Sequence, residues 1–549
     1  MRQWRFLVYG AGVDDLNGRG QGELSMLTVA RMAARTLLKE LPEGTDLGAV
    51  CMDLASYSSQ PIEHLRRRLL NLSINERNYW IGTLYTLMMT QEARRAQAAY
   101  FTPPYLAEAV IDLAVEHGFD LLRHDVLDPA AGGAAFLSII AARMRVAGAK
   151  PDDIAYRLNG VEMDSCLAEI SEHLIAEQLD GYRGRRVVEI GDSLHATPLA
   201  SYNLVIANPP YGRITPNHLK DDRWTKVAHM GHINKYAVFT ELCLRVAKPR
   251  GLVVLVIPSS FRGGPLYDKM RSFIAAQGQI LALGTVTNRE DVFADVAQDI
   301  SVLLVRKGSE HRTILPVNFP DFTANGIQRP VPTGSLPIDV SSPWLAPADS
   351  NRERGGATIA DYGVVAKAGY FVWNREQEKF CDREDANAFP LIWAKNVRPG
   401  QPCVPANRTA DGVDFVRVPE GSQAVVSSPA LIIQRTSNSN QPRRIIAATV
   451  DKDSVAPWKG FVSENHTIVV YGPNSEMVVL LAKLLNTSAV DERYRAVSGT
   501  ATVSVKLLRE LDLPPPEVFR EALRATSDPE AAAAIAYRTG GGGGLAEVS

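Results

Sequence analysis

Apolar residues recur at three- and four-residue spacing along the first part of the chain. The spacing is clearest over residues 27–41 and 62–72, and it is the period of an amphipathic helix. We therefore expect residues 1–98 to form a helical accessory region.

Between residues 126 and 261 the pattern changes to short apolar runs separated by amphipathic stretches. The runs cover residues 126–128, 158–162, 187–192, 204–207 and 252–257. Strands that alternate with helices predict a mostly parallel sheet with helices on both faces. We expect an α/β fold of the doubly wound kind, in a domain that covers residues 99–320.

Pro, Gly, Ser and Asn become frequent over residues 308–360, and we place a domain boundary there. Beyond it, short β-rich runs at 430–433 and 467–471 and a helix near 475–485 predict a second, mixed α/β domain over residues 350–515. We expect residues 516–549 to be a helical or disordered tail, because the chain ends in a low-complexity glycine run at 540–544.

Composition narrows the class of protein. The 549 residues are 46% hydrophobic and 22% charged, as in an ordinary soluble globular protein. No apolar run reaches the roughly 20 residues that cross a bilayer, and no apolar segment of a secretion signal follows the N-terminus. The five cysteines have no CxxC spacing, which argues against a disulfide framework and a zinc site. A reducing cytoplasm fits this cysteine usage.

The formal net charge of −2 predicts no strongly basic surface. Binding to nucleic acid would then require a cleft that concentrates positive potential locally.

Acidic residues end three successive predicted strands. They are Asp128, Glu162 and Asp192, and doubly wound folds hold ligands at this edge of the sheet. Glu162 is placed to accept hydrogen bonds from two ribose hydroxyls, and Asp192 from the amino group of an adenine. Three such residues in succession suggest a nucleoside-like cofactor, although each alone could be an ordinary solvated carboxylate.

The loop over residues 128–136 turns from strand to helix through small residues, which permit close approach of a ligand to the backbone. By itself the loop is a weak signal, because it lacks the GxGxxG spacing of dinucleotide sites.

Asn208-Pro209-Pro210-Tyr211 follows the fourth strand and is the sharpest feature of the sequence. An aromatic amine is a poor nucleophile until acceptors hold its hydrogens. The Asn208 side-chain oxygen and the Pro209 carbonyl could supply two such acceptors and stabilise the developing positive charge. The prolines fix the backbone, and Tyr211 offers a face for an extruded base. Pro-Pro-Tyr is also a common turn, but its position at a strand end, after Asp192, favours the site.

These features, in this order, resemble the gamma-class adenine-N6 DNA methyltransferases of bacterial restriction–modification systems. The resemblance covers residues 95–305. It rests on Tyr100-Phe101-Thr102-Pro103-Pro104, the Asp128 loop, Gly160-Val161-Glu162-Met163-Asp164, Gly191-Asp192-Ser193-Leu194, Asn208 to Tyr211, Lys235-Tyr236-Ala237-Val238-Phe239, Val256-Ile257-Pro258-Ser259-Ser260-Phe261 and Val292-Phe293-Ala294-Asp295. A fainter likeness, at residues 495–503, is to the end of target-recognition regions.

The resemblance implies a Rossmann-like, S-adenosylmethionine-dependent domain followed by a target-recognition domain. It implies methylation of adenine N6 in double-stranded DNA by base flipping, with no metal. The implied catalytic residues are Asn208, Pro209, Pro210 and Tyr211, and the implied base-stacking residues are Tyr211 and Phe293. The implied cofactor-binding residues are Thr102, Asp128, Ala130, Gly132, Glu162, Met163, Asp192, Ser193 and Asn208. Tyr236 and Phe239 are expected to pack beneath the active-site loop.

One position departs from the family pattern. Ala134 stands where the family usually has a second glycine, so its methyl group is expected to crowd the cofactor or to shift the loop.

A polar cluster in a predicted loop of the second domain could touch DNA, although it could equally be a hydrated loop. It contains Arg435, Asn438, Arg443 and Arg444, together with Asn440 and Gln441. His229 and His232 are three residues apart, but no third ligand completes a metal site. We expect a monomer that acts on duplex DNA, with a cognate restriction endonuclease as a possible partner.

Two other functions stay open at this point. An Asn-Pro-Pro-Tyr loop can hold any planar amide or amine, so RNA or a protein glutamine could be the substrate. A catalytically silent DNA-binding module could also have kept the fold, although the intact Asn208 loop with Glu162 and Asp192 argues against it.

Overall fold

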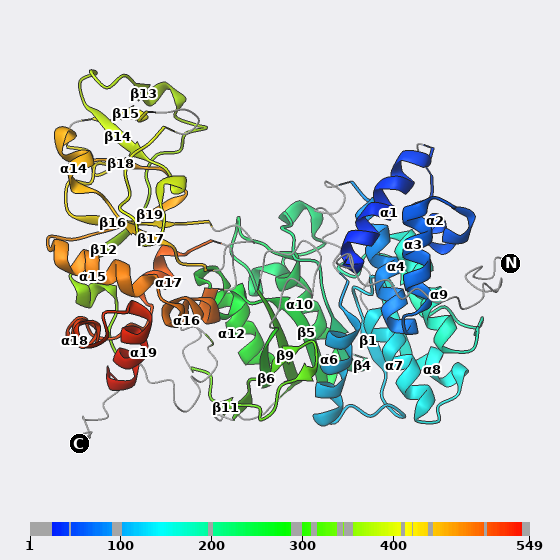
Figure 1. Ribbon diagram of the computed structural model, residues 1–549. Helices are drawn as coiled ribbons and strands as arrows, with labels where there is room; N and C mark the ends of the chain where they lie inside the picture. The colour runs from blue at the N-terminus through cyan, green and yellow to red at the C-terminus, as the bar shows by residue number, and fades with distance from the viewer. Residues whose placement is uncertain are drawn as a thin grey trace, which may run out of the picture. The chain divides into compact units, whose positions relative to one another are not determined.

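A computed structural model describes most of the chain. The described residues are 25–42, 45–90, 101–195, 201–286, 299–308, 316–337, 344, 355–407, 412–419, 421–436, 443–498 and 502–540. The chain divides into two compact units (Figure 1). The first contains Met1–Pro258 and Leu266–Ile338, and the second contains Ser259–Pro265 and Asp339–Ser549.

The described residues of the N-terminal region, 25–42 and 45–90, are mainly helical, as the apolar spacing predicts, and the other residues of the expected region 1–98 lie outside the described residues. Its helices are α1 (Met26–Glu40), α2 (Leu47–Met52), α3 (Gln60–Leu70) and α4 (Ile74–Met88). Their buried side chains share one apolar core with Leu167, Ile170 and Leu174 of α9 (Ser165–Gln178). The helices (blue in Figure 1) therefore pack onto the α/β fold within the first unit and do not form a separate domain.

A large sheet forms the centre of the first unit. Its main strands run in the order β3-β2-β1-β4-β5-β7-β6, and all neighbours are parallel except those of β7. The strands are β1 (Val126–Asp128), β2 (Leu158–Glu162), β3 (Val188–Ile190), β4 (Tyr202–Ala207), β5 (Ala247–Pro258), β6 (Gly278–Val286) and β7 (Ile300–Lys307), and the edge adds β8 (Val317–Asn318), β9 (Asp321–Thr323), β10 (Gly326–Ile327) and β11 (Thr333–Gly334). The predicted α/β fold is confirmed.

Helices cover this sheet. They include α6 (Pro104–Glu116), α7 (Ala135–Val146), α8 (Pro151–Arg157), α9, α10 (Lys235–Val246) and α12 (Asp268–Gln277). The strand order reverses between β1 and β4, since β2 and β3 lie on one side and β5 on the other. Open α/β sheets bind ligands at the carboxyl ends of the strands at such a switch point.

The second unit contains two small sheets. One has the order β12-β19-β16-β17 and the other β13-β15-β14-β18. The strands are β12 (Val365–Ala368), β13 (Phe380–Cys381), β14 (Ala388–Ile392), β15 (Phe415–Arg417), β16 (Ala430–Gln434), β17 (Ala447–Thr449), β18 (Val462–Ser463) and β19 (Thr467–Tyr471). The helices are α14 (Lys452–Val455), α15 (Ser475–Leu485), α16 (Ser488–Ser498), α17 (Val505–Arg509), α18 (Pro516–Thr526) and α19 (Pro529–Gly540).

The last helices differ from the expected separate tail. Phe519 of α18 and Ala532 and Tyr537 of α19 are buried in the same core as β16 and β19. Both helices have an apolar face, and burying that face joins them to the unit. Gly540 ends α19, and the rest of the predicted disordered glycine run lies outside the described residues.

A short segment of the central chain also belongs to the second unit. It contains α11 (Ser260–Gly263). Trp344 packs edge-on against Phe261 with ring centroids 6.2 Å apart. The backbone N–H of Trp344 donates to the Arg262 carbonyl at 2.7 Å, and Arg262 Nε donates to the Trp344 carbonyl at 3.1 Å. The chain therefore passes between the units three times.

Among the helices that the structure describes, none is both long enough and apolar enough to cross a membrane.

Candidate active site

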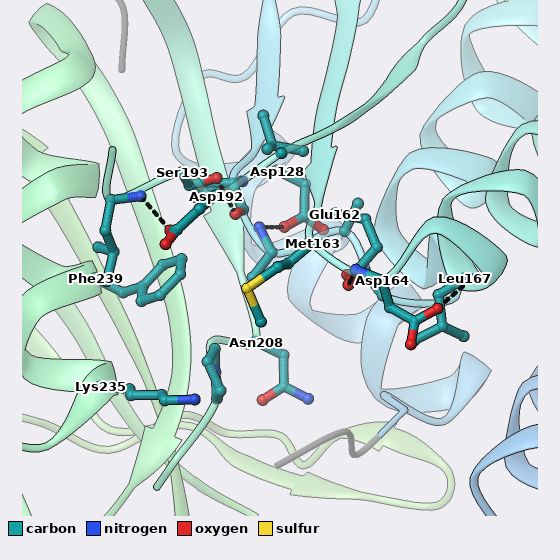
Figure 2. A pocket seen from close by; sticks show the side chains of 18 of the residues that line it. Asp128, Glu162, Met163, Asp164, Leu167, Asp192, Ser193, Asn208, Lys235 and Phe239 are labelled. Carbon is teal, nitrogen blue, oxygen red and sulfur yellow. Dashed lines mark hydrogen bonds between the residues drawn. The ribbon is translucent and has the colours of Figure 1, made fainter. Parts of the chain in front are cut away.

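A cavity of about 720 Å³ opens at the carboxyl ends of β1 to β4. The loops that follow these strands line it, together with the start of α10 (Figure 2). The predicted site residues Thr102, Asp128, Ala130, Gly132, Glu162, Met163, Asp192, Ser193, Asn208 and Pro210 all line this cavity. The structure thus brings together side chains that are more than a hundred positions apart in the sequence.

Asp128 lies at the floor of the cavity, at the end of β1. Its side chain is buried, and one carboxylate oxygen accepts a hydrogen bond from the Ala130 backbone N–H at 3.0 Å. Burial raises the pKa of Asp128 to about 8, although the Ala130 N–H opposes that rise. Asp128 is therefore mainly protonated at neutral pH and can donate a hydrogen bond as well as accept one.

Glu162 joins two loops of the cavity. Its Oε2 accepts from the Gly132 N–H at 2.9 Å, and its Oε1 accepts from the Asp164 N–H at 2.8 Å. Burial raises the pKa of Glu162, while these two backbone hydrogen bonds oppose the rise. Each carboxylate oxygen has a second lone pair, so Glu162 can also accept two hydroxyl groups from a ribose.

Asp192 and Ser193 fix the loop after β3. Asp192 Oδ1 accepts from the Leu194 N–H at 2.9 Å, and Oδ2 lies 2.6 Å from Nδ1 of His195. The Ser193 hydroxyl donates to the Pro129 carbonyl at 2.5 Å. This bond ties the loop after β3 to the loop after β1, and both loops line the same cavity.

Ala134 adopts the left-handed conformation, with φ of 52°, where α7 begins. The conformation explains why glycine is favoured at this position. The side chain is buried in the core of the sheet domain and is not part of the cavity lining. The Ala134 methyl group thus lies in the sheet core rather than in the cavity lining, and its left-handed backbone carries local strain. Whether this position affects a ligand stays a prediction.

Asn208 directly follows β4, and its side chain contacts Thr102 and Tyr211. Its Nδ2 donates to the Thr102 hydroxyl at 3.1 Å, and its Oδ1 accepts from the Tyr211 hydroxyl at 2.7 Å. The Tyr211 hydroxyl also lies 3.3 Å from the Val256 carbonyl of β5. These contacts hold the carboxamide of Asn208, which lines the cavity.

The Tyr211 ring is half-buried. It packs edge-on against Tyr236, with centroids 6.3 Å apart, and against the core of the sheet domain. Tyr211 does not line the cavity in this structure, whereas Pro210 does. The predicted stacking role of Tyr211 stays a prediction. Phe293 lies outside the described residues.

Several cavity residues were not predicted from the sequence to bind a ligand, among them Phe101, Lys235 and Phe239. Phe101 enters from the segment before α6, and Lys235 and Phe239 come from the first turns of α10. The i, i+4 spacing of Lys235 and Phe239 places both on one helix face. This spacing is the sequence feature from which their shared position could have been predicted. Burial lowers the pKa of Lys235, while nearby Asp192 opposes that shift.

The predicted DNA-binding arginines make contacts inside the second unit. Arg444 is buried and its backbone N–H donates to Asp491, Arg443 forms an ion pair with Glu530, and Arg435 donates to the Asn465 carbonyl at 3.2 Å. These contacts are structural, so the structure gives no support to this cluster as a DNA surface. Asn438, Asn440 and Gln441 lie outside the described residues.

His229 is bound to Asp268, with Nε2 and Oδ1 2.6 Å apart. In the described part of the chain, no group of three or more His, Cys, Asp or Glu side chains could hold a metal.

One family of known proteins matches part of this chain. The model of the N-6 DNA Methylase family matches residues 77–329. The Type II methyltransferase M.PstI of Providencia stuartii is 22% identical over 340 residues, which cover 58% of this chain and 66% of that protein. M.BsuBI of Bacillus subtilis is 21% identical over 356 residues, which cover 60% of this chain and 68% of that protein.

The crystal structure of the type IIG restriction endonuclease BpuSI aligns with 89% of this chain and 70% of that chain, at 14% identity and a TM-score of 0.44. The family match and the two methyltransferase relatives confirm the predicted resemblance to adenine-N6 DNA methyltransferases of restriction–modification systems. The chain spans about two thirds of the length of these two relatives.

Proposed function

We propose that the whole protein, whose residues 77–329 match the model of the N-6 DNA Methylase family, is a site-specific DNA methyltransferase that acts on adenine N6. The observation that carries the proposal is that the Asn208 loop opens onto the same cavity as Asp128, Glu162 and Asp192. A site for a nucleoside-like donor and a site for an amine thus adjoin at one edge of the sheet.

The cavity fits S-adenosylmethionine by the chemistry of its lining. Glu162 offers acceptors for ribose hydroxyls, Asp192 offers an acceptor for an adenine amino group, and Met163 offers an apolar face that is 57% exposed. When bound, this molecule supplies an electrophilic methyl group on a positively charged sulfur. The partly exposed carboxylate of Asp192, which lines the cavity, favours such a positive ligand.

The catalytic loop acts on the amine of the target base. Asn208 Oδ1 and the Pro209 carbonyl accept the two amine hydrogens, which draws the nitrogen lone pair out of conjugation with the ring. As positive charge develops on the nitrogen, the same two oxygens stabilise it. Tyr211 and Thr102 hold the Asn208 carboxamide in place before the base arrives, so little reorganisation is needed.

A base inside a duplex cannot reach this cavity, so the target adenine must leave the stack. We assign sequence reading to residues 350–515 and place the protein in the cytoplasm as a monomer, with a cognate endonuclease as a possible partner. The mixed α/β build of this region, with two small sheets, supports a separate recognition function.

Transfer of tritiated methyl groups from S-adenosylmethionine to duplex DNA, RNA and protein tests the proposal. We expect label in duplex DNA, and long-read sequencing of DNA from expressing cells should show N6-methyladenine in one sequence context. Label in RNA or protein alone would replace DNA as the substrate. No label in any substrate, together with DNA binding, would favour the silent module.

A further inference from the structure

One face of helix α4 is turned toward the candidate cofactor site. Asn78, Gly82 and Tyr85 follow i, i+4, i+7 spacing, which places them on the same side of the helix. Each of them lies against a different part of the cavity wall.

Tyr85 reaches the loop after β2. Its hydroxyl lies 3.2 and 3.1 Å from the two carboxylate oxygens of Asp164, a residue that lines the cavity. Asp164 in turn caps α9 by accepting from the Leu167 N–H at 3.0 Å. The helix thus holds the loop that carries Glu162.

Gly82 makes room for Phe101. A Cβ atom on Gly82 would lie only 2.8 Å from Cε1 of the Phe101 ring, and one on Gly133 would lie 2.3 Å from the same atom. The ring is therefore wedged between α4 and the loop after β1. Phe101 lines the cavity, so α4 sets the position of one cavity wall.

Asn78 is the residue that points to a ligand. It is 5% exposed, and neither its Nδ2 nor its Oδ1 has a hydrogen-bond partner among the residues that the structure describes. A buried amide without partners destabilises a fold by about 1–3 kcal/mol, so such a group is unusual unless it has a function.

Asn78 faces a small recess of about 10 Å³. Phe101, Thr102, Gly133 and Ala135 line both this recess and the large cavity. The recess is thus a continuation of the cavity at the Thr102 end, and its volume admits about one oxygen-sized atom.

We propose that Asn78 binds the carboxylate of the α-amino acid group of S-adenosylmethionine, beside Thr102, so that the N-terminal helices complete the cofactor site. The inference rests on the proposed function. Asn78 Nδ2 donates to one carboxylate oxygen, which occupies the recess. The helical region is then part of the binding site and not only an accessory to it.

Isothermal titration calorimetry with two ligands tests this. S-adenosylhomocysteine carries the α-amino acid group, and 5′-methylthioadenosine does not. Asn78→Leu removes both polar atoms at similar volume. We expect the Kd for S-adenosylhomocysteine to rise about tenfold or more, from the loss of a hydrogen bond to a charged group, and the Kd for 5′-methylthioadenosine to stay unchanged.

Asn75→Ala is the matched control. Asn75 also borders the recess, but its side chain is paired with Gln178 at 3.1 Å, so neither Kd should change. Equal loss of both ligands in Asn78→Leu would mean that Asn78 only supports the fold, and unchanged binding of both would also overturn the inference. If the unmodified protein binds neither ligand, the proposed function itself fails.

Discussion

Replacing Asp128 by asparagine tests whether the buried carboxyl group at the end of β1 is neutral. The pKa of Asp128 is about 8 in the folded chain, whereas an unfolded aspartate has a pKa of about 3.9. Between these values the folded state holds a proton that the unfolded state has lost. The stability contributed by this site therefore falls as pH rises from about 4 to about 8 and is constant above that.

The expected size follows from the same two values. The reference is low pH, where the Asp128 carboxyl is protonated in both the folded and the unfolded state. Relative to that reference, the carboxyl lowers the free energy of unfolding by at most about 5 kcal/mol at pH 8 and by about 1.5 kcal/mol at pH 5. An asparagine side chain at this position would keep an acceptor for the Ala130 N–H, which lies at 3.0 Å in the native site, but it cannot ionise. Asp128→Asn should therefore be more stable than the native protein at pH 8, with a gain that shrinks by at least half at pH 5.

Urea unfolding of the cofactor-free protein at pH 5, 6.5 and 8 measures this difference. Asp192→Asn is the control, because Asp192 lies in the loop after β3 with a partly exposed side chain, and it should show no such gain at pH 8. A stability difference between the native protein and Asp128→Asn that is the same at all three pH values would refute the reasoning.

Five further substitutions probe the site. Asn208→Ala should lower kcat by about 10²-fold or more and leave the Kd for S-adenosylmethionine nearly unchanged; full activity would contradict the proposed mechanism. Tyr211→Phe, which loses the 2.7 Å hydrogen bond to Asn208, should lower kcat about 3- to 10-fold, whereas Tyr211→Ala should lower it further and weaken base capture, as read by 2-aminopurine fluorescence in the target position. Ala134→Gly relieves the strain of the left-handed backbone, which stabilises the fold by about 1 kcal/mol, but it also removes a buried methyl group, which destabilises the fold by about the same amount. Stability and cofactor affinity should therefore both change little, and a clear gain in affinity would support the crowding hypothesis. Gly82→Ala should push the Phe101 ring toward the cavity and weaken cofactor binding, and unchanged calorimetric affinity would show that the wall can adjust.

The sheet was predictable because its strands carry a strong local signal. The runs ending in Asp128 and Glu162 match the bounds of β1 and β2, and β1 is buried along its length, as a central strand covered on both faces must be. The carboxylates that line the cavity were also predictable, because the carboxyl ends of parallel strands lie at the same edge of the sheet.

Contacts between distant segments were not predictable. The Tyr211 hydroxyl on Asn208, the Phe101 ring between Gly82 and Gly133, and the buried amide of Asn78 depend on which helix packs against which loop. No periodicity carries that information. The left-handed backbone at Ala134 and the burial of its side chain could likewise not be read from the sequence pattern.

The short segment around α11 limits how this protein can be re-engineered. A chimera with a single junction in the chain would divide the second unit, because that unit contains residues 259–265 as well as the C-terminal residues. With a junction near residue 338, Phe261 and Arg262 would come from the protein that supplies the N-terminal part. Trp344, which contacts both residues, would come from the protein that supplies the C-terminal part. A functional chimera must therefore transplant residues 259–265 together with the C-terminal region, as two separate pieces of one graft.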